Sequence, residues 1–154
     1  MRRLFAVAWT IWLVDFLTKI WALSALTSTP RSVLGTTLQF VLVKNSGAAF
    51  SFAAGFTIFF TLLALAVVVV ITYYAPRITS QGWLVALGLV LGGVLGNLTD
   101  RIFRQPGFLN GNVIDWIQIP HWPVFNLADS AISVAAALAL VLSLRNIAPI
   151  TEVR

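Results

Sequence analysis

Residues 83–102 have the sequence WLVALGLVLGGVLGNLTDRI, which is long enough to cross a bilayer as one helix. Its glycines recur at four-residue spacing, at Gly88, Gly92 and Gly96, so they share one helix face. Such a stripe of small residues lets neighbouring helices approach closely in lipid. The spacing predicts that this helix lies at the centre of a bundle.

Three more apolar runs have the length of a membrane span, and they cover residues 4–26, 56–74 and 124–144. The composition agrees, because 59% of the 154 residues are apolar and only 10% are charged, against about 25% in soluble domains. The sequence therefore predicts an all-α integral membrane protein. We expect a bundle of four transmembrane helices in a single domain, residues 1–154.

Both termini lie on one side of the membrane when the number of spans is even. Arg2 and Arg3 abut the first span, which favours a cytoplasmic location for both termini. Asp15 and Lys19 interrupt the first apolar run, so we interpret it as a retained helix rather than a cleaved signal peptide. The cytoplasmic basic residues would be Arg2, Arg3, Arg77, Arg145 and Arg154, and the outer ones Arg31, Lys44 and Arg104, with Arg101 at the boundary.

Composition excludes several functional classes. The chain has no cysteine and one histidine, His121, so thiol chemistry and a histidine-rich zinc site are impossible. The net charge of +5 does not indicate nucleic-acid binding, because the basic residues are scattered at the ends of apolar runs. That pattern is typical of topology signals and lipid-headgroup contacts. We expect no metal, no cofactor and no nucleic acid.

The region between the first and second spans, residues 28–52, is the first that is not helical. Val33–Val43 is rich in Val, Leu, Thr and Phe, which predicts a small β-structure at the membrane surface. Residues 45–50 follow, and there Gly47 permits backbone conformations closed to other residues. The small alanines of this segment would let a ligand approach, but a plain turn into the second helix fits equally well.

Four of the five acids lie inside or at the edge of apolar runs, where each ionised group costs about 2.5–3.5 kcal/mol. Asp15 and Lys19 are four residues apart and share a helix face, so they form either an internal ion pair that eases insertion or a functional support. Asn97, Asp100 and Arg101 also share a face. The helix dipole favours Arg101 there but not Asp100, which leaves pairing of the two as the simple alternative.

The remaining acids, Asp115 and Asp129, form the most informative pair. Asn126 and Asp129 resemble an N-cap with an acid at the third helical position. Asp115 lies within an apolar run, and a surface turn is its simplest structural explanation. The segment between the two acids can fold back on itself. Two close, poorly solvated carboxylates share a proton and can act as base and acid in peptide-bond hydrolysis.

Other mechanisms and other classes of protein compete with this hypothesis. A serine–lysine dyad would need Ser46 beside Lys19 or Lys44. A serine nucleophile could instead use His121 as its base, but His121 next to Trp122 and Pro123 is typical of a residue at the membrane interface. A small proton-coupled transporter or channel subunit would also use intramembrane acids, spread through the bilayer depth, and would oligomerise. A non-enzymatic assembly protein would use the glycine stripe and the outer loop to bind a partner.

Five motifs in sequence order resemble those of bacterial lipoprotein signal peptidase, also called signal peptidase II. The motifs are Asp15-Phe16-Leu17-Thr18-Lys19, Asn45-Ser46-Gly47-Ala48-Ala49-Phe50, Gly96-Asn97-Leu98-Thr99-Asp100-Arg101, Val113-Ile114-Asp115-Trp116 and Phe125-Asn126-Leu127-Ala128-Asp129. Trp116 stands where phenylalanine is expected, and Phe16 varies a loosely fixed position. Neither change removes a functional group.

This resemblance implies a four-helix aspartic endopeptidase of the bacterial cytoplasmic (inner) membrane. It would remove the signal peptide from diacylglyceryl-modified prolipoproteins by cleaving before the lipidated cysteine, with Asp115 and Asp129 as the catalytic pair. The substrate-binding and supporting residues would be Asp15, Lys19, Asn45, Gly47, Asn97, Asp100, Arg101 and Asn126. The resemblance further implies an active site toward the outer face, a β-structure that cradles the substrate, contacts with membrane lipids, a monomer, and inhibition by globomycin.

Overall fold

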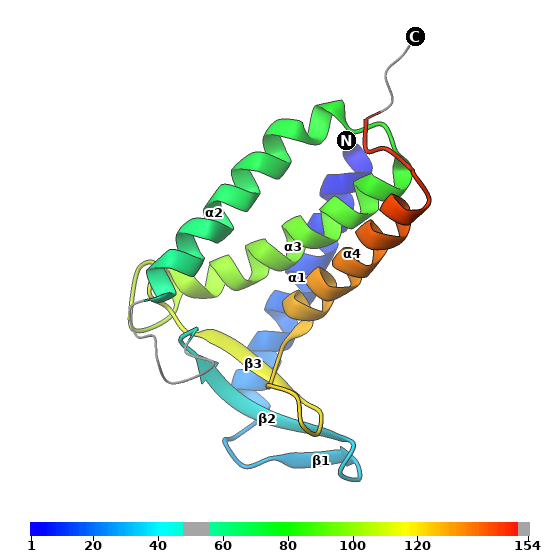
Figure 1. The fold of residues 1–154 in the computed structure, drawn as a ribbon. Helices are drawn as coiled ribbons and strands as arrows, with labels where there is room; N and C mark the ends of the chain where they lie inside the picture. The colour runs from blue at the N-terminus through cyan, green and yellow to red at the C-terminus, as the bar shows by residue number, and fades with distance from the viewer. Residues whose placement is uncertain (48–55, 151–154) are drawn as a thin grey trace.

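The computed structural model describes residues 1–47 and 56–150. Its long helices are α1 (Arg2–Ala25), α2 (Phe56–Tyr74), α3 (Gln81–Phe103) and α4 (Leu127–Leu144), and a short 3-10 helix, η1 (Ala75–Arg77), follows α2. Four helices are long and apolar enough to cross a membrane, which confirms the predicted four-helix bundle (Figure 1). Residues 48–50 of the expected ligand-approach segment, together with Glu152 and Arg154, lie outside the described residues.

The start of α4 differs from the prediction by three residues. The apolar run begins at Val124, but the helix begins at Leu127 because Asn126 caps it. The Asn126 side chain accepts a hydrogen bond from the backbone N–H of Asp129 at 2.9 Å, which satisfies one of the free donors of the first turn. The apolar run thus shows approximately which residues cross the membrane, whereas the capping residue determines where the helix begins.

Helix α3 lies at the centre of the bundle, as the glycine stripe predicts, and packs against α1, α2 and α4. Its glycines allow backbone contact. A Cβ atom added to Gly88 would lie 2.7 Å from the carbonyl oxygen of Leu4, and one added to Gly92 would lie 2.6 Å from that of Ala8. Within lipid such close packing replaces the hydrophobic driving force between helices.

A three-stranded antiparallel sheet covers one end of the bundle, in the order β1 (Arg31–Leu34), β2 (Leu38–Asn45), β3 (Val113–Gln118). Strands β1 and β2 form the expected β-structure between α1 and α2. Strand β3 comes from the connection between α3 and α4, where a surface turn was the simplest explanation for Asp115. The register places Val43 opposite Asp115. This pairing joins segments far apart in the chain, which local sequence patterns do not reveal.

Aromatic packing fixes the sheet to the end of α1. The ring of Trp116 in β3 lies edge-on to the rings of Trp21 in α1 and Phe40 in β2, with centroids 5.3 and 5.1 Å apart. Edge-to-face contacts of this kind add to the stability gained from burying the rings. The sheet therefore has a fixed position against the helices.

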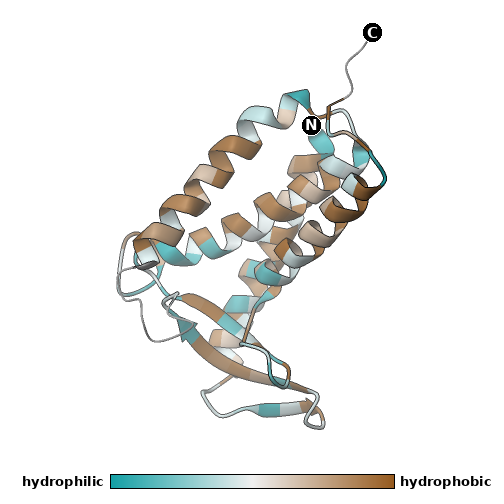
Figure 2. Ribbon diagram, in the orientation of Figure 1, coloured by the Kyte–Doolittle hydropathy of each residue, from teal (hydrophilic) through white to brown (hydrophobic). Residues whose placement is uncertain are grey.

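The start of α1 and the end of α4 lie at the end of the bundle opposite the sheet (Figure 1). There Arg3 donates a hydrogen bond to Gln81 at 2.9 Å, and the backbone N–H of Thr79 donates to Pro149 at 3.1 Å. Figure 2 shows hydrophobic residues along the middle of the helices and hydrophilic residues gathered near both ends. This banding is the distribution expected for a bundle that spans a bilayer.

Replacing Gly92 with alanine is expected to lower the free energy of unfolding by about 1–3 kcal/mol, because the new Cβ meets the backbone of α1. Thermal unfolding in detergent micelles measures the loss. Gly82→Ala in the same helix is the matched control, since its Cβ meets only the flexible end of Leu142. Equal melting temperatures for the two variants would contradict the close-packing argument.

Candidate active site

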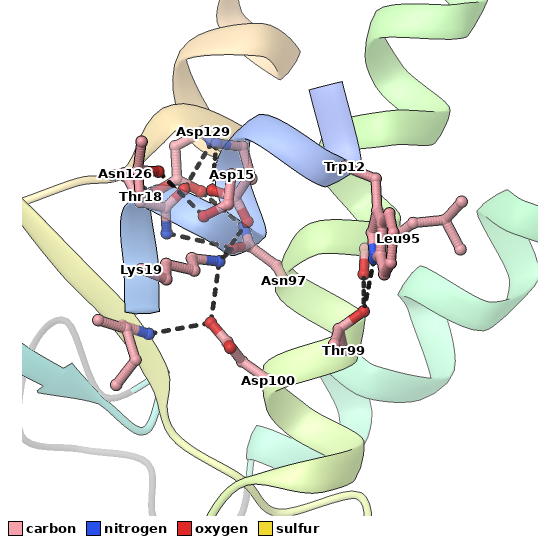
Figure 3. Close-up of polar contacts among 12 residues, drawn as sticks. Trp12, Asp15, Thr18, Lys19, Leu95, Asn97, Thr99, Asp100, Asn126 and Asp129 are labelled. Carbon is pink, nitrogen blue, oxygen red and sulfur yellow. Dashed lines mark hydrogen bonds and ion pairs between the residues drawn. The ribbon is translucent and has the colours of Figure 1, made fainter. Parts of the chain in front are cut away.

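A buried lysine joins two of the spanning helices. The ammonium of Lys19 in α1 lies 2.8 Å from a carboxylate oxygen of Asp15 and 2.8 Å from one of Asp100 in α3. It also donates a hydrogen bond to the side-chain oxygen of Asn97 at 3.0 Å (Figure 3). Lys19 is 1% exposed and both aspartates are equally buried, so three directed contacts replace the water that this cation loses.

The sequence offered an ion pair between Asp100 and Arg101 as the simple explanation of Asp100, and the structure shows that this pairing is wrong. Its carboxylate pairs with Lys19 and with Arg104, and it accepts a hydrogen bond from the backbone N–H of Ile114 at 3.1 Å; Arg101 is not its partner. Arg104 was missed as a partner, although its four-residue distance from Asp100 is a signal for pairing on a helix. Asp100 therefore connects α3 to α1 and to the strand that contains Asp115.

Asp115 lies on β3 and is 1% exposed. One carboxylate oxygen accepts a hydrogen bond from the side chain of Asn45 at 2.8 Å, and the other accepts from the side chain of Asn126 at 2.7 Å. Strand pairing supplies the first contact, because Asn45 ends β2 beside β3. The helix cap supplies the second.

Asp129 has the capping role that its spacing indicates and a further contact as well. One of its carboxylate oxygens accepts from the backbone N–H of Asn126 at 3.1 Å, which completes a capping box. The other accepts from the side chain of Asn97 at 2.8 Å. The cap therefore leaves one oxygen of Asp129 directed toward α3.

Asn126 lies between the two carboxylates. Its amide donates to Asp115, and its side-chain oxygen and backbone N–H are bonded to Asp129. The same amide also donates to Asn97 at 3.1 Å. Asn126 is fully buried, so these contacts hold Asp115 and Asp129 in a fixed relation within one hydrogen-bonded network.

The environment of Asp115 favours its protonated form. Burial raises the pKa of Asp115 to about 6, against the opposing effect of the Asn45 hydrogen bond. The negative charge of Asp129 raises this pKa as well, while the hydrogen bond from Asn126 and the positive charge of Lys19 lower it. A carboxyl group that retains its proton near pH 6 can act as a general acid.

Asp15 also holds the helix on which Asp129 lies. Its second carboxylate oxygen accepts a hydrogen bond from the backbone N–H of Ala128 at 2.9 Å, in the first turn of α4. A negative group at a helix N-terminus satisfies a free N–H and complements the helix dipole. Through Asp15 the ion-pair cluster fixes the start of α4.

Arg101 and Gly47 lie together beside this network. A Cβ atom added to Gly47 would lie 3.6 Å from Nη2 of Arg101, and Gly47 adopts a positive φ of 89°, which favours glycine. Within the described part of the chain, the buried Nη1 of Arg101 has no hydrogen-bond partner. The guanidinium therefore retains donors for a bound group.

These observations define a class: a four-helix membrane protein with one buried and one half-buried aspartate, joined through Asn126, where the bundle meets the sheet. The signal peptidase (SPase) II family model matches residues 7–145, so the chain belongs to the signal peptidase II family. Membership of this family makes it a protease.

Several curated relatives are similar over nearly the whole chain. The lipoprotein signal peptidase of Streptomyces coelicolor is 48% identical over 147 residues, which cover 95% of this chain and 72% of the relative. The lipoprotein signal peptidase of Mycobacterium avium is 46% identical over 145 residues, which cover 94% of this chain and 80% of the relative.

Solved structures of a bacterial membrane enzyme have the same fold. One has a TM-score of 0.81 at 24% identity, covering 100% of this chain and 94% of its own. A second has a TM-score of 0.82 at 24% identity, covering 94% of each chain.

Replacing Lys19 with methionine is expected to lower the free energy of unfolding by about 3–5 kcal/mol, because it leaves Asp15 and Asp100 buried without their shared cation. The measurement is thermal unfolding in micelles. Arg104→Met is the control: its side chain is 23% exposed, and its removal leaves the contact between Asp100 and Lys19, so a loss of at most about 1 kcal/mol is expected. A Lys19→Met protein as stable as Arg104→Met would refute the central role of the lysine.

Proposed function

We propose that this protein is an aspartic endopeptidase that removes the signal peptide from diacylglyceryl-modified prolipoproteins, cleaving just before the lipidated cysteine. The observation that carries the mechanism is the position of Asn126, whose side-chain amide donates to the carboxylate of Asp115 and whose backbone N–H donates to the carboxylate of Asp129. Membership of the signal peptidase II family and the name of the curated relatives support the substrate class.

In the proposed reaction the two carboxylates share one proton. The ionised group removes a proton from a water molecule, whose oxygen attacks the carbonyl carbon of the scissile peptide bond, while the protonated group hydrogen-bonds the carbonyl oxygen. The resulting tetrahedral diol collapses as a proton passes to the cysteine nitrogen. This breaks the C–N bond and releases the signal peptide with a free carboxyl end.

The surrounding residues would bind the substrate or order the pair. No described residue satisfies the buried Nη1 of Arg101, which would donate to a substrate carbonyl, and Gly47 beside it adopts a positive φ that favours glycine. Asn45, Asn97 and Asn126 would orient the aspartates. Asp15, Lys19 and Asp100 would support the site from the helices without contacting the scissile bond.

The membrane setting suits a lipid-anchored substrate. We place the protein in the bacterial inner membrane as a single-domain monomer, with both termini cytoplasmic and the sheet end toward the outer face. The substrate's acyl chains would remain in lipid while its scissile bond reaches the carboxylates. Globomycin is the expected inhibitor at this site.

Asp115→Asn and Asp129→Asn are each expected to lower cleavage by about a hundredfold to ten-thousandfold, because asparagine preserves the shape but cannot exchange the proton. The assay is cleavage of a purified diacylglyceryl-prolipoprotein, with product mass fixing the cut site. Ser133→Ala is the control, since its hydroxyl bonds only the backbone oxygen of Asp129, and it should retain activity. A folded Asn variant that cleaves at near the wild-type rate would rule out the shared-proton mechanism.

The pH profile tests the hydrogen bond from Asn45. Below the Asp115 pKa of about 6 the pair retains its shared proton, so kcat/KM is expected to fall as pH rises through this value. Asn45→Ala removes a donor that favours the ionised carboxylate, so the alkaline fall should move to higher pH. Asn110→Ala is the matched control, because Asn110 donates nothing to Asp115. A profile that moves to lower pH in Asn45→Ala would contradict the assignment.

A further inference from the structure

Two buried threonines in the first turns of α2 bond to backbone outside their own helix. Thr57 is 4% exposed and Thr61 is fully buried. By comparison, Thr10 and Thr72 bond to carbonyl oxygens one turn earlier in their own helices, which is the usual contact of a threonine in an apolar helix. The hydroxyls of Thr57 and Thr61 instead link α2 to other parts of the chain.

Thr57 holds the turn that follows β2. Its hydroxyl donates to the carbonyl oxygen of Ser46, the residue directly after Asn45. In the same turn the side-chain oxygen of Asn45 accepts a hydrogen bond from the backbone N–H of Gly47 at 2.8 Å. The side-chain amide of Asn45 then donates to Asp115, also at 2.8 Å. The direction of this amide therefore depends on the turn that Thr57 fixes.

Thr61 holds the connection between α3 and β3. Its hydroxyl lies 2.9 Å from the carbonyl oxygen of Leu109 and 2.9 Å from that of Thr57, so the two oxygens share its one hydrogen. Leu109 has a φ of 65°, a left-handed conformation that is unfavourable for leucine. The contact with Thr61 helps to hold this conformation. The segment leads into β3, which contains Asp115.

The two hydroxyls thus bond α2 to the segments on either side of the contact between β2 and β3. The register pairs Asn45 with Val113, so the end of β2 lies beside the start of β3. The start of α2 lies next to both (Figure 1). Because Thr57 and Thr61 are buried, the loss of either hydroxyl would leave a carbonyl oxygen with one donor fewer in a place that water does not readily reach.

We propose that Thr57 and Thr61 are positioning residues for the hydrolysis, because they hold Asn45 and Asp115 in contact. This inference rests on the proposed function and adds no group to the bond-breaking step. Both hydroxyls bond to backbone oxygens, so they act through the position of the two strands and do not act on the substrate.

The test uses Thr57→Val and Thr61→Val, since valine keeps the branched shape of threonine but lacks the hydroxyl. The assay is cleavage of a purified diacylglyceryl-prolipoprotein, and thermal unfolding in micelles checks that each variant is folded. Each substitution is expected to lower kcat by about tenfold to a hundredfold with KM unchanged, the effect of a small misplacement of a catalytic group. Thr57→Ser and Thr61→Ser keep the hydroxyl and should have a kcat close to that of wild type.

Thr72→Val is the matched control. Thr72 is an exposed threonine of the same helix, and its hydroxyl bonds to the helix's own backbone, so kcat should not change. Thr57→Ala and Thr61→Ala repeat the comparison if a valine variant does not fold. An equal loss of kcat in the valine and serine variants would overturn the role of the hydroxyls.

The pH profile separates positioning from a loss of stability. Thr57→Val should move the alkaline fall of kcat/KM to higher pH, because a looser turn weakens the Asn45 hydrogen bond that favours the ionised form of Asp115. Partial unfolding would lower the rate without moving the profile. In an Asn45→Ala background Thr57→Val should add no further shift, because the bond is already absent. A further shift there would contradict action through Asn45.

The outcomes also separate this inference from the proposed function. If wild type cleaves before the cysteine and the folded valine variants keep its kcat and pH profile, the function stands and the positioning role is wrong. If folded wild type cleaves no prolipoprotein, both proposals fail.

Discussion

The ammonium of Lys19 is the interaction on which the site depends. It brings Asp15 of α1 and Asp100 of α3 together in a place without solvent, and either carboxylate alone would be strongly unfavourable there. Each carboxylate also contacts a further segment: the second oxygen of Asp15 bonds the first turn of α4, and the oxygen of Asp100 that faces Lys19 also accepts from the backbone N–H of Ile114 in β3. One buried charge cluster thereby positions both segments that contain the proposed catalytic aspartates.

Asparagines rather than basic residues contact those aspartates directly. Asn45 and Asn126 donate to Asp115, and Asn97 donates to Asp129. An arginine or lysine in direct contact would lower the pKa of Asp115 far more than an amide does. Neutral donors can therefore fix the geometry while burial keeps this pKa near 6, which is the condition for a shared proton.

Close backbone packing around α3 makes this arrangement possible. A Cβ atom at Gly96 would meet both Asp15 and Ala128, so the ion-pair cluster and the start of α4 both approach the α3 backbone there. Gly111 allows the connection to β3 to pass close to the end of α3, where its N–H donates to the carbonyl oxygen of Arg101 at 3.0 Å. Larger residues at these positions would separate the elements that meet at the site.

The sequence by itself determined the four spans, the central position of α3, and the faces that Asp15 shares with Lys19 and Asn97 shares with Asp100, because helical periodicity is local. It also indicated the cap at Asn126. Only the tertiary structure decided that β3 pairs with β2, that Asp100 binds Lys19 and Arg104 rather than Arg101, and that Asn126 joins Asp115 to Asp129. These contacts depend on strand register and helix packing between segments distant in the chain, and no local pattern specifies them.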